Sequence, residues 1–278
     1  MIELGNYNEL KILRSTSVGL FLGDDEGTEI LLPNKYVPED VRPDDMLSVF
    51  CYLDHQERPI ATTLKPKIIR NGFAYLEVVE VNEIGAFLDW GLEKHLFVPF
   101  REQHSRLTAG HRYVVHCYLD EQSFRLVGST KLDKFLKNTE HDFTVNDEVE
   151  ILVSRKTELG WEVIIENKYK GLIFFSDVFK PLSIGLSLTG YVKNVRDDRK
   201  VDIVLQPIGM KMLDEVANTI YEKLKAADGF IPLNDKSPPE LIKDYLQMSK
   251  KAFKKGVGVL YKNRKILIKE DGIQLVEK

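Results

Sequence analysis

The 278-residue sequence predicts a mainly β, multi-domain protein with a helical region at its C-terminal end. Short runs of β-branched and aromatic residues, separated by glycine and polar turn residues, follow one another up to residue 206. Beyond that point apolar residues recur at helical spacing. A chain of this length is long enough for several small domains.

The clearest strands lie between residues 73 and 100. Apolar residues dominate residues 73–81 and 84–88, in a pattern that suits a pleated surface. After a glycine-containing break, residues 96–98 resume the pattern before Pro99, which has no N–H for a central ladder. This stretch therefore predicts a three-stranded β-meander.

The features of this meander recur upstream at a fixed offset of 66 residues. Three pairs of segments share the offset: 19–22 with 85–88, 32–33 with 98–99, and 49–54 with 115–120. Repetition at one spacing indicates two copies of one structural unit. Cys51 and Cys117 occupy equivalent positions in the two copies. We therefore expect two buried thiols that pack as small hydrophobes, the alternative being a disulfide between them.

A third, more diverged copy begins near Phe143. Residues 160–163 stand in place of residues 85–88, residues 170–177 supply the next strand, and residues 190–205 form the last hairpin. With roughly five short strands each, the three copies suit small closed barrels of the OB type, because closure removes exposed sheet edges. We expect these barrels at residues 1–64, 65–137 and 138–206.

Three helices are predicted after the third copy. The first has apolar residues on one face, namely Leu213, Val216, Ala217, Ile220 and Leu224. Ser237-Pro238-Pro239-Glu240 has the sequence of a capping box with proline at the first helical position, and it predicts the start of a second helix. Ser249 can cap a third helix that ends near Lys262.

A β-hairpin is predicted at the end of the chain. Strands at residues 265–269 and 273–276 are joined by Asp271-Gly272, a strong hairpin turn signal. Three helices followed by a hairpin indicate a winged helix-turn-helix domain over residues 207–278. The predicted fold class is thus mainly β and multi-domain, with three tandem five-stranded OB-fold barrels followed by an α+β winged helix-turn-helix domain.

The composition is that of an ordinary globular protein, with 43% hydrophobic residues, 29% charged residues and a net charge of −4. The acidic total argues against phosphate binding by the whole surface, although it leaves room for a local basic or aromatic face. No apolar run approaches the roughly 20 residues that cross a bilayer, and the N-terminal residues lack the pattern of a secretory signal. With two cysteines as well, we expect a cytoplasmic protein that does not act at a membrane.

Known catalytic motifs are missing from the sequence. It contains no P-loop, no dinucleotide-binding fingerprint and no nucleophile elbow. His104, His111, His116 and Cys117 do not have the spacing of a zinc site, and a hairpin turn explains residues 197–198 better than a metal-binding pair does. We therefore expect a binding protein and not an enzyme, without cofactor or metal.

The middle copy contains Gly85-Ala86-Phe87-Leu88, a glycine loop, and an apolar strand that ends at Val98-Pro99-Phe100. In these features it resembles the S-one RNA-binding domain, an OB-fold module named for the ribosomal protein built from its repeats. Residues 170–177 of the third copy, KGLIFFSD, match the module in part. Three such barrels followed by a winged helix resemble the bacterial conserved virulence factor B family over nearly the whole chain. This resemblance implies RNA binding and a regulatory role in the bacterial cytoplasm.

The S-one resemblance implies that RNA lies across the second and third strands of a barrel. The first implied contact is the aromatic of the Gly-Ala-Phe segment, which is Phe21 or Phe87, while Trp161 is displaced by one residue. The second is an aromatic or histidine late in the third strand, where the three copies have Leu32, Val98 and Phe174. The third is an Asp and Arg set on the last hairpin, here Asp54, Asp120 and Asp197 with Arg58, Arg125 and Arg199. No copy has the full set, which favours weak sites summed along the chain.

Stacking on aromatic side chains contributes about 1–3 kcal/mol per base to the binding of single-stranded RNA. From spacing alone, core positions in their barrels are slightly favoured over exposed ones for Phe21 and Phe87. The resemblance favours an exposed stacking role for Phe87. We assign Trp90, Phe97 and Phe100 to packing or to the rim of a barrel.

The C-terminal region is basic, whereas the rest of the chain is acidic. Residues 207–278 contain 13 Lys and one Arg against five Asp and five Glu, a net charge of +4, and the preceding residues have −8. Basic residues cluster in and after the third predicted helix: Lys250, Lys251, Lys254, Lys255, Lys262, Arg264 and Lys265. Lysine in the first turn is unfavourable with the helix dipole, so contact with a phosphate backbone is one explanation. A solvated lysine face is the other.

We predict a protein that binds single-stranded RNA multivalently and regulates expression post-transcriptionally. The predicted RNA-contacting residues are Phe21, Phe87, Trp161, Phe174, Arg58, Arg125, Arg199, Lys250, Lys251, Lys254, Lys255, Lys262 and Arg264. One alternative is a protein-interaction scaffold whose barrels have lost RNA binding. The other is a regulator that binds duplex DNA through the winged helix.

Overall fold

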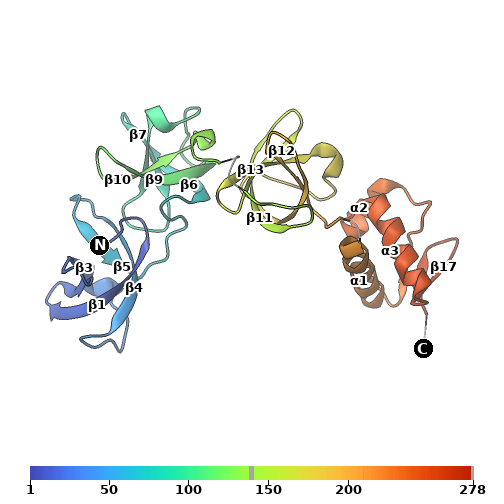
Figure 1. Cartoon of the computed structure of the whole chain (residues 1–278), viewed down its shortest axis with the longest axis horizontal. Helices are drawn as coiled ribbons and strands as arrows, with labels where there is room; N and C mark the ends of the chain where they lie inside the picture. The colour runs from blue at the N-terminus through green and yellow to red at the C-terminus, as the bar shows by residue number, and fades with distance from the viewer. Residues whose placement is uncertain (138–140, 209, 277–278) are drawn as a thin grey trace. The chain divides into compact units, whose positions relative to one another are not determined.

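The computed structural model describes residues 1–137, 141–208 and 210–276, without the side chains of residues 210–215. Within these ranges it has three closed five-stranded barrels, three α-helices and a three-stranded sheet, which confirms the predicted fold class (Figure 1). The chain divides into two compact units, residues 1–136 and 137–278. The predicted position Leu213 lies outside the described side chains, and the domain boundaries after residues 64, 137 and 206 remain a prediction.

The first unit contains two barrels with the same strand pairing. The first barrel consists of β1 (Tyr7–Thr16), β2 (Gly19–Gly23), β3 (Glu29–Pro33), β4 (Met46–Leu53) and β5 (Pro59–Thr62). The second consists of β6 (Phe73–Val81), β7 (Gly85–Asp89), β8 (Leu96–Pro99), β9 (Arg112–Asp120) and β10 (Arg125–Ser129). In both, the third and fifth strands pair in parallel and close the barrel. A short 3₁₀ helix follows each third strand, at Asn34–Tyr36 and Phe100–Glu102.

The glycine at the start of the second strand explains why the sequence motif recurs in both barrels. Gly85 begins β7 and lies opposite Pro99, as Gly19 lies opposite Pro33 in the first barrel. A Cβ atom on Gly85 would lie 2.5 Å from the carbonyl oxygen of Val98. The second and third strands therefore approach each other too closely for any other residue at this position.

Both cysteines are buried and free, as predicted from their equivalent positions. Burial raises the pKa of the Cys51 and Cys117 thiols to about 12. Each thiol therefore behaves as a small apolar group of its barrel core.

The two barrels of the first unit share an apolar contact. Phe50 and Tyr52 of β4 pack edge-on against Trp90 of the second barrel, with ring centroids 5.8 and 6.3 Å apart. Trp90 is buried, in agreement with its predicted packing role. A backbone hydrogen bond of 2.7 Å from Arg70 N–H to the carbonyl of Gly5 adds to this contact. The first and second barrels therefore pack directly against each other.

The second unit begins with the third barrel. Its strands are β11 (Glu148–Lys156), β12 (Gly160–Ile165), β13 (Tyr169–Phe174), β14 (Ser187–Val195) and β15 (Val201–Val204), and the 3₁₀ helix Phe175–Asp177 follows β13. Gly160 lies opposite Phe174, and a Cβ atom on it would lie 2.0 Å from the carbonyl oxygen of Ile173. The third barrel therefore repeats the glycine contact of the other two.

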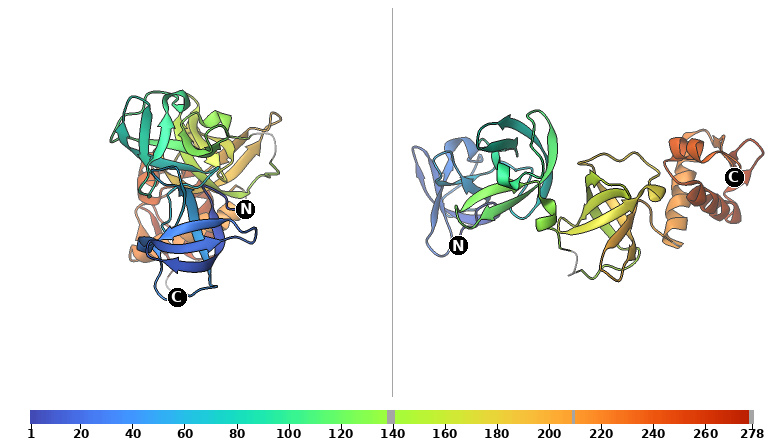
Figure 2. Two further views of the ribbon diagram at one scale, coloured as in Figure 1. Left: turned by 90° about the vertical axis from the view of Figure 1, so that its left-hand side faces the viewer. Right: turned by 90° about the horizontal axis from the view of Figure 1, so that it is seen from above.

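The C-terminal elements form a winged helix, in which three helices pack together beside a small sheet (Figure 2). They are α1 (Met210–Ala226), β16 (Phe230–Ile231), α2 (Pro239–Leu246), α3 (Lys250–Lys262), β17 (Ile266–Ile268) and β18 (Ile273–Leu275). The Ser249 hydroxyl accepts the N–H of Ala252 at 3.2 Å, so the predicted cap of α3 is confirmed. None of the helices described is long and apolar enough to span a membrane.

The capping box predicted for α2 is wrong. The N-cap is Pro238, with Pro239 in the first turn, and no side chain caps this helix. The Ser237 hydroxyl instead accepts the backbone N–H of Asn234 at 2.9 Å. Ser237 lies one residue before the cap, so its hydroxyl serves the preceding loop.

Candidate nucleic-acid interface

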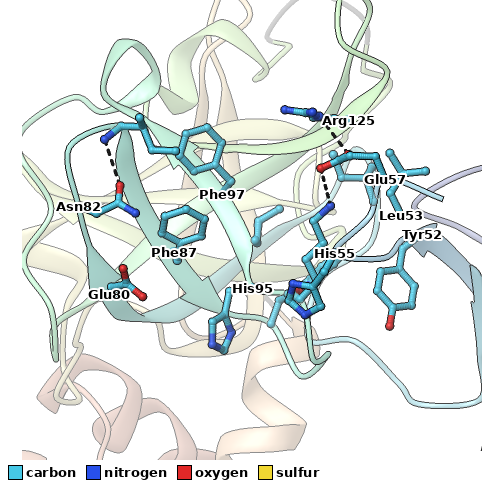
Figure 3. Close-up of a pocket in the computed structure, with 15 residues that line it drawn as sticks. Tyr52, Leu53, His55, Glu57, Glu80, Asn82, Phe87, His95, Phe97 and Arg125 are labelled. Atoms are coloured by element: carbon cyan, nitrogen blue, oxygen red, sulfur yellow. Dashed lines mark hydrogen bonds and ion pairs between the residues drawn. The ribbon is translucent and has the colours of Figure 1, made fainter. Parts of the chain in front are cut away.

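An aromatic pair lies on the outer face of the second barrel. Phe87 of β7 and Phe97 of β8 are direct cross-strand partners, and their ring centroids are 5.1 Å apart at an interplanar angle of 34°. Both rings are half-buried, whereas Leu88 and Leu96 beside them are fully buried. Because side chains alternate across a strand, the two phenylalanines share the outer face of the β7–β8 ladder (Figure 3).

The aromatic pair opens into a groove of about 450 Å³ between the two barrels of the first unit. Its lining comes from both barrels: Tyr52, Leu53, His55, Glu57, Glu80, Asn82, Ile84, Phe87, Trp90, Lys94, His95, Leu96, Phe97, Arg125 and Leu126. In Figure 3, Glu80 and Asn82 lie on one side of Phe87, and the hairpin residues His55 and Glu57 lie on the other. The groove therefore combines an apolar, aromatic floor with polar groups at both ends.

Charged groups of both barrels meet at the end of the groove that the first barrel forms. The Glu57 carboxylate accepts from Lys94 Nζ and from Arg125 Nε, each at 3.0 Å. Lys94 Nζ also donates to the carbonyl oxygen of Asp54 at 2.8 Å. Nearby, Nδ1 of His95 is buried and has no hydrogen-bond partner within the described residues. Two cations of the second barrel are thus held by a carboxylate of the first.

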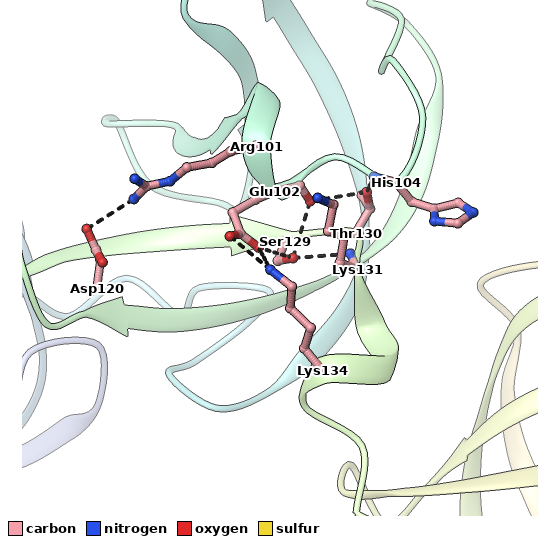
Figure 4. A network of polar contacts seen from close by, with 8 residues as sticks. All are labelled: Arg101, Glu102, His104, Asp120, Ser129, Thr130, Lys131 and Lys134. Carbon is pink, nitrogen blue, oxygen red and sulfur yellow. Dashed lines mark hydrogen bonds and ion pairs between the residues drawn. The ribbon is translucent and has the colours of Figure 1, made fainter.

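The predicted arginines of the barrel hairpins have different surroundings. Arg58 forms an ion pair with Asp54 at 2.7 Å and stays within its own turn. Arg125 pairs in register with Asp120, yet its guanidinium contacts Glu57. Asp120 instead lies 3.5 Å from Arg101 (Figure 4). Only Arg125 of these hairpin arginines lines the aromatic groove.

The segment that leaves the second barrel is fixed to it by a polar network (Figure 4). Glu102 is buried, and its carboxylate accepts from the Ser129 hydroxyl at 2.7 Å and from Lys134 Nζ at 3.2 Å. Lys134 belongs to the 3₁₀ helix Leu132–Lys134, and Phe135 after it stacks on the His116 ring with centroids 4.0 Å apart. Burial lowers the pKa of His116 to about 4.

Phe21, the equivalent position in the first barrel, is covered on one face. The Arg14 guanidinium lies 4.3 Å from the centroid of the Phe21 ring. Glu29 holds Arg14 through two hydrogen bonds of 2.6 Å. Leu31, not an aromatic residue, is the cross-strand partner of Phe21. This barrel therefore lacks the aromatic pair of the second.

The third barrel has a carboxylate where the second has Phe87. Strand register places Glu162 opposite Leu172 and Arg155, as Phe87 lies opposite Phe97 and Glu80. The displacement of Trp161 by one residue is thus confirmed.

The predicted equivalence of Phe174 with Leu32 and Val98 is wrong. Phe174 lies opposite Gly160, which is the place of Pro33 and Pro99, and Ile173 is the true equivalent. Leu32, Val98 and Ile173 are all fully buried. The outward position on the third strand lies one residue earlier, at Leu31, Phe97 and Leu172.

Ion pairs occupy the corresponding face of the third barrel. Only 8% of the Glu162 side chain is exposed, and it lies 2.9 Å from Arg155 and 2.7 Å from Lys170. Beyond these groups, Lys156 Nζ lies 5.7 Å from the centroid of the Trp161 ring. Arg196 lies 5.4 Å from the ring of Phe174. These two aromatics are therefore each next to a cation, and they do not pair with each other.

Arg199 is in a turn of the third barrel, with a positive φ of 64°. Its backbone carbonyl lies 2.8 Å from His141 Nε2, and its guanidinium lies 3.4 Å from the His141 carbonyl oxygen. Arg199 therefore contacts the segment that enters the barrel.

The basic residues of the winged helix are mostly exposed. Lys251, Lys254, Lys255, Lys262 and Arg264 are all exposed. Within the second unit, Lys251 and Lys255 line a groove of about 350 Å³ that includes side chains of the third barrel.

Lys250 differs from the other lysines of α3. Its Nζ donates to the carbonyl oxygen of Ser237 at 2.8 Å, and the side chain is partly buried. This contact connects the start of α3 to the loop before α2. Lys250, a predicted RNA contact, thus also has a structural role within the winged helix.

Phe97, Glu57 and Lys94 are among the groove residues that sequence reasoning missed. Strand alternation could have identified Phe97, because it lies between the buried Leu96 and Val98. No sequence pattern could have identified Glu57, because its place in the groove depends on how the two barrels pack.

Comparison with known proteins agrees with the domain composition. Residues 4–64 match the S1 domain and residues 218–275 match the CvfB-like winged helix domain. These domains support a nucleic-acid-binding role for the chain.

Relatives cover most of the chain. It is 30% identical over 269 residues to the Bacillus subtilis protein named "Uncharacterized protein YitL", which covers 94% of this chain and 90% of that protein. It is 26% identical over 238 residues to conserved virulence factor B of Staphylococcus aureus, covering 83% of this chain and 79% of that protein. A crystal structure of a multidomain protein with nucleic acid binding domains from Streptococcus pneumoniae matches with 26% identity, 98% coverage of both chains and a TM-score of 0.43. The sequence identity to these relatives over most of the chain, together with the two matching domain models, shows that the chain belongs to the conserved virulence factor B family.

Proposed function

We propose that the protein binds single-stranded RNA in the bacterial cytoplasm and regulates gene expression post-transcriptionally. The observation that supports this most is the Phe87–Phe97 pair on the outer face of the second barrel. Two half-buried rings on adjacent strands offer a platform for unpaired bases, and each stacked base contributes about 1–3 kcal/mol. The name of the Staphylococcus aureus relatives further suggests virulence as the setting of this regulation.

Several weak contacts along the chain would supply the affinity. The second barrel provides the stacking platform, and the exposed lysines of α3 provide phosphate contacts that do not depend on base sequence. The domains are joined in one chain, so a second contact forms at a raised effective concentration. Weak individual sites are consistent with the net charge of −4.

Titration of the full chain with labelled oligouridylate and with duplex DNA, at about 50 and 200 mM salt, tests the proposal. We expect tighter binding to the single strand and a clear loss of affinity at the higher salt. Lys254→Gln should reduce the log–log salt slope by about 0.7, since one phosphate contact is lost. Tighter binding to duplex DNA would contradict the proposal and favour a function of the winged helix.

A second candidate is a protein-interaction scaffold. It is favoured by the first and third barrels, where Arg14 covers Phe21 and an ion pair replaces the aromatic pair. Failure to bind either nucleic acid at low salt would support it. Retained RNA binding that depends on Phe87 would exclude it for the second barrel.

A further inference from the structure

We propose that Glu57 of the first barrel occupies the place of an RNA phosphate in the binding groove of the second. This inference rests on the proposed function, because it assumes that a base stacks on Phe87 and Phe97. Arg125 is already a predicted RNA contact; the new content is that Lys94 joins it in holding the phosphate next to that base, and that Glu57 now neutralises both cations. The first barrel would thereby limit the affinity of the second.

The geometry of Glu57 supports this role. Its two carboxylate oxygens contact different cations, Oε1 with Lys94 and Oε2 with Arg125, each at 3.0 Å. All three side chains line the groove that contains the aromatic pair. A phosphate also offers several anionic oxygens, and it can bridge a lysine and an arginine in the same way.

The exposure of these groups permits an exchange of carboxylate for phosphate. The Glu57 and Arg125 side chains are 38% and 56% exposed, so separating them buries no uncompensated charge. Lys94 is less exposed and keeps its hydrogen bond to the Asp54 carbonyl, which would hold the ammonium in place during the exchange. An arriving phosphate would therefore meet one fixed cation and one mobile cation.

The backbone of Glu57 is also unusual. It has a positive φ of 62°, a conformation that is uncommon for residues other than Gly, Asn and Asp. The tip of the β4–β5 hairpin thus has a long acidic side chain where a shorter residue would fit the turn better. The hairpins of the other two barrels also have a non-glycine residue at positive φ, Phe124 and Arg199, so this conformation is a feature of the hairpin, and the argument for Glu57 rests on its contacts.

Glu57→Gln in the full chain tests the inference, with labelled oligouridylate as the probe. The change keeps the size of the side chain and removes its charge. We expect RNA affinity at low salt to rise about fivefold, because the phosphate no longer has to displace a carboxylate from Lys94 and Arg125. The log–log salt slope should steepen by about 0.7 for each released cation.

Two comparisons isolate the effect. Glu9→Gln removes one exposed carboxylate from β1 of the same barrel, away from the groove lining, and should change affinity little. In a Phe87→Ala background, Glu57→Gln should give no gain, because both residues act on one bound nucleotide. A gain of equal size in that background, or an equal gain from Glu9→Gln, would overturn the inference.

Arg125→Gln provides an independent test that does not change Glu57. It should weaken binding and lower the salt slope by about 0.7. If Phe87→Ala weakens binding while Glu57→Gln and Arg125→Gln have no effect, the inference fails and the proposed function stands. If Phe87→Ala has no effect on a chain that binds RNA, the stacking site itself is wrong.

Discussion

The second and third barrels have the same strand order and the same glycine contact, but their outer faces differ chemically. At equivalent positions the second barrel has Phe87 and Phe97, and the third has Glu162 and Leu172. Glu162 is buried between Arg155 and Lys170, so its surroundings are already satisfied by protein groups. We therefore expect the outward cross-strand pair, and not the fold, to decide whether a barrel can stack bases by this face.

The largest expected effect is common to both barrels. Gly85→Ala and Gly160→Ala should each destabilise their own barrel by about 3 kcal/mol, because the new Cβ collides with a backbone carbonyl. Hydrogen exchange of the strands of each barrel measures this loss. Gly258→Ala in α3, where nothing lies within 4 Å, is the control and should stabilise its helix by up to about 1 kcal/mol. Equal protection of mutant and wild-type barrels would refute the glycine argument.

The stability of the second barrel should also depend on pH, with an effect smaller than that of the glycine substitutions. The buried His116 has a pKa of about 4 in the folded state, below the ordinary value of 6.5, so the unfolded chain binds more protons between these values. The contribution of His116 to the stability of the second barrel is fully present above pH 6.5 and should decrease as the pH falls toward 4. Hydrogen exchange of β9 at several pH values checks this trend. His116→Phe should flatten it, and an unchanged slope in that variant would assign the effect to other groups.

RNA binding should depend on the Phe87–Phe97 face of the second barrel and not on the corresponding face of the third. Phe87→Ala or Phe97→Ala should weaken RNA binding by about 1–3 kcal/mol while the second barrel stays folded. Leu172→Ala, at the position of Phe97 in the third barrel, is the matched control and should change affinity little. Anisotropy titrations measure the affinity, and circular dichroism checks the fold. Unfolding of the second barrel in Phe87→Ala would show that this ring is part of the core.

The smallest effect concerns the carboxylate of the third barrel. Glu162→Gln should destabilise this barrel by about 1–2 kcal/mol, since Arg155 and Lys170 lose a buried ionic partner but stay partly exposed. Exchange of the β12 amides measures the change. Asp198→Gln, which removes an exposed ion pair with Lys200, should change stability little. An equally small effect of both changes would mean that Glu162 has no structural role.

Much of the fold could be predicted because local patterns determine it. The offset of 66 residues identified the first two barrels, and the glycine at the start of each second strand is common to all three. The Asp271-Gly272 turn and the Ser249 cap marked elements of the winged helix. These features depend on neighbouring residues and strand pairs, which a sequence records directly.

The site was less predictable because its chemistry depends on register and packing. A shift of one residue separates the buried Ile173 from Phe174, and motif matching alone confused the two. Phe97 lies on the outer face through strand alternation, which the resemblance did not address. Glu57 reaches the groove only because the first two barrels pack against each other. No local pattern contains that information.

The central claim is that single-stranded RNA lies on the β7–β8 face of the second barrel. Photo-crosslinking of the full chain to an oligonucleotide that contains 4-thiouridine, followed by mass spectrometry of the linked peptides, tests it most directly. We predict crosslinks within residues 85–99, with Phe87 and Phe97 among the modified positions. Crosslinks confined to other parts of the chain, with none in residues 85–99, would contradict the claim.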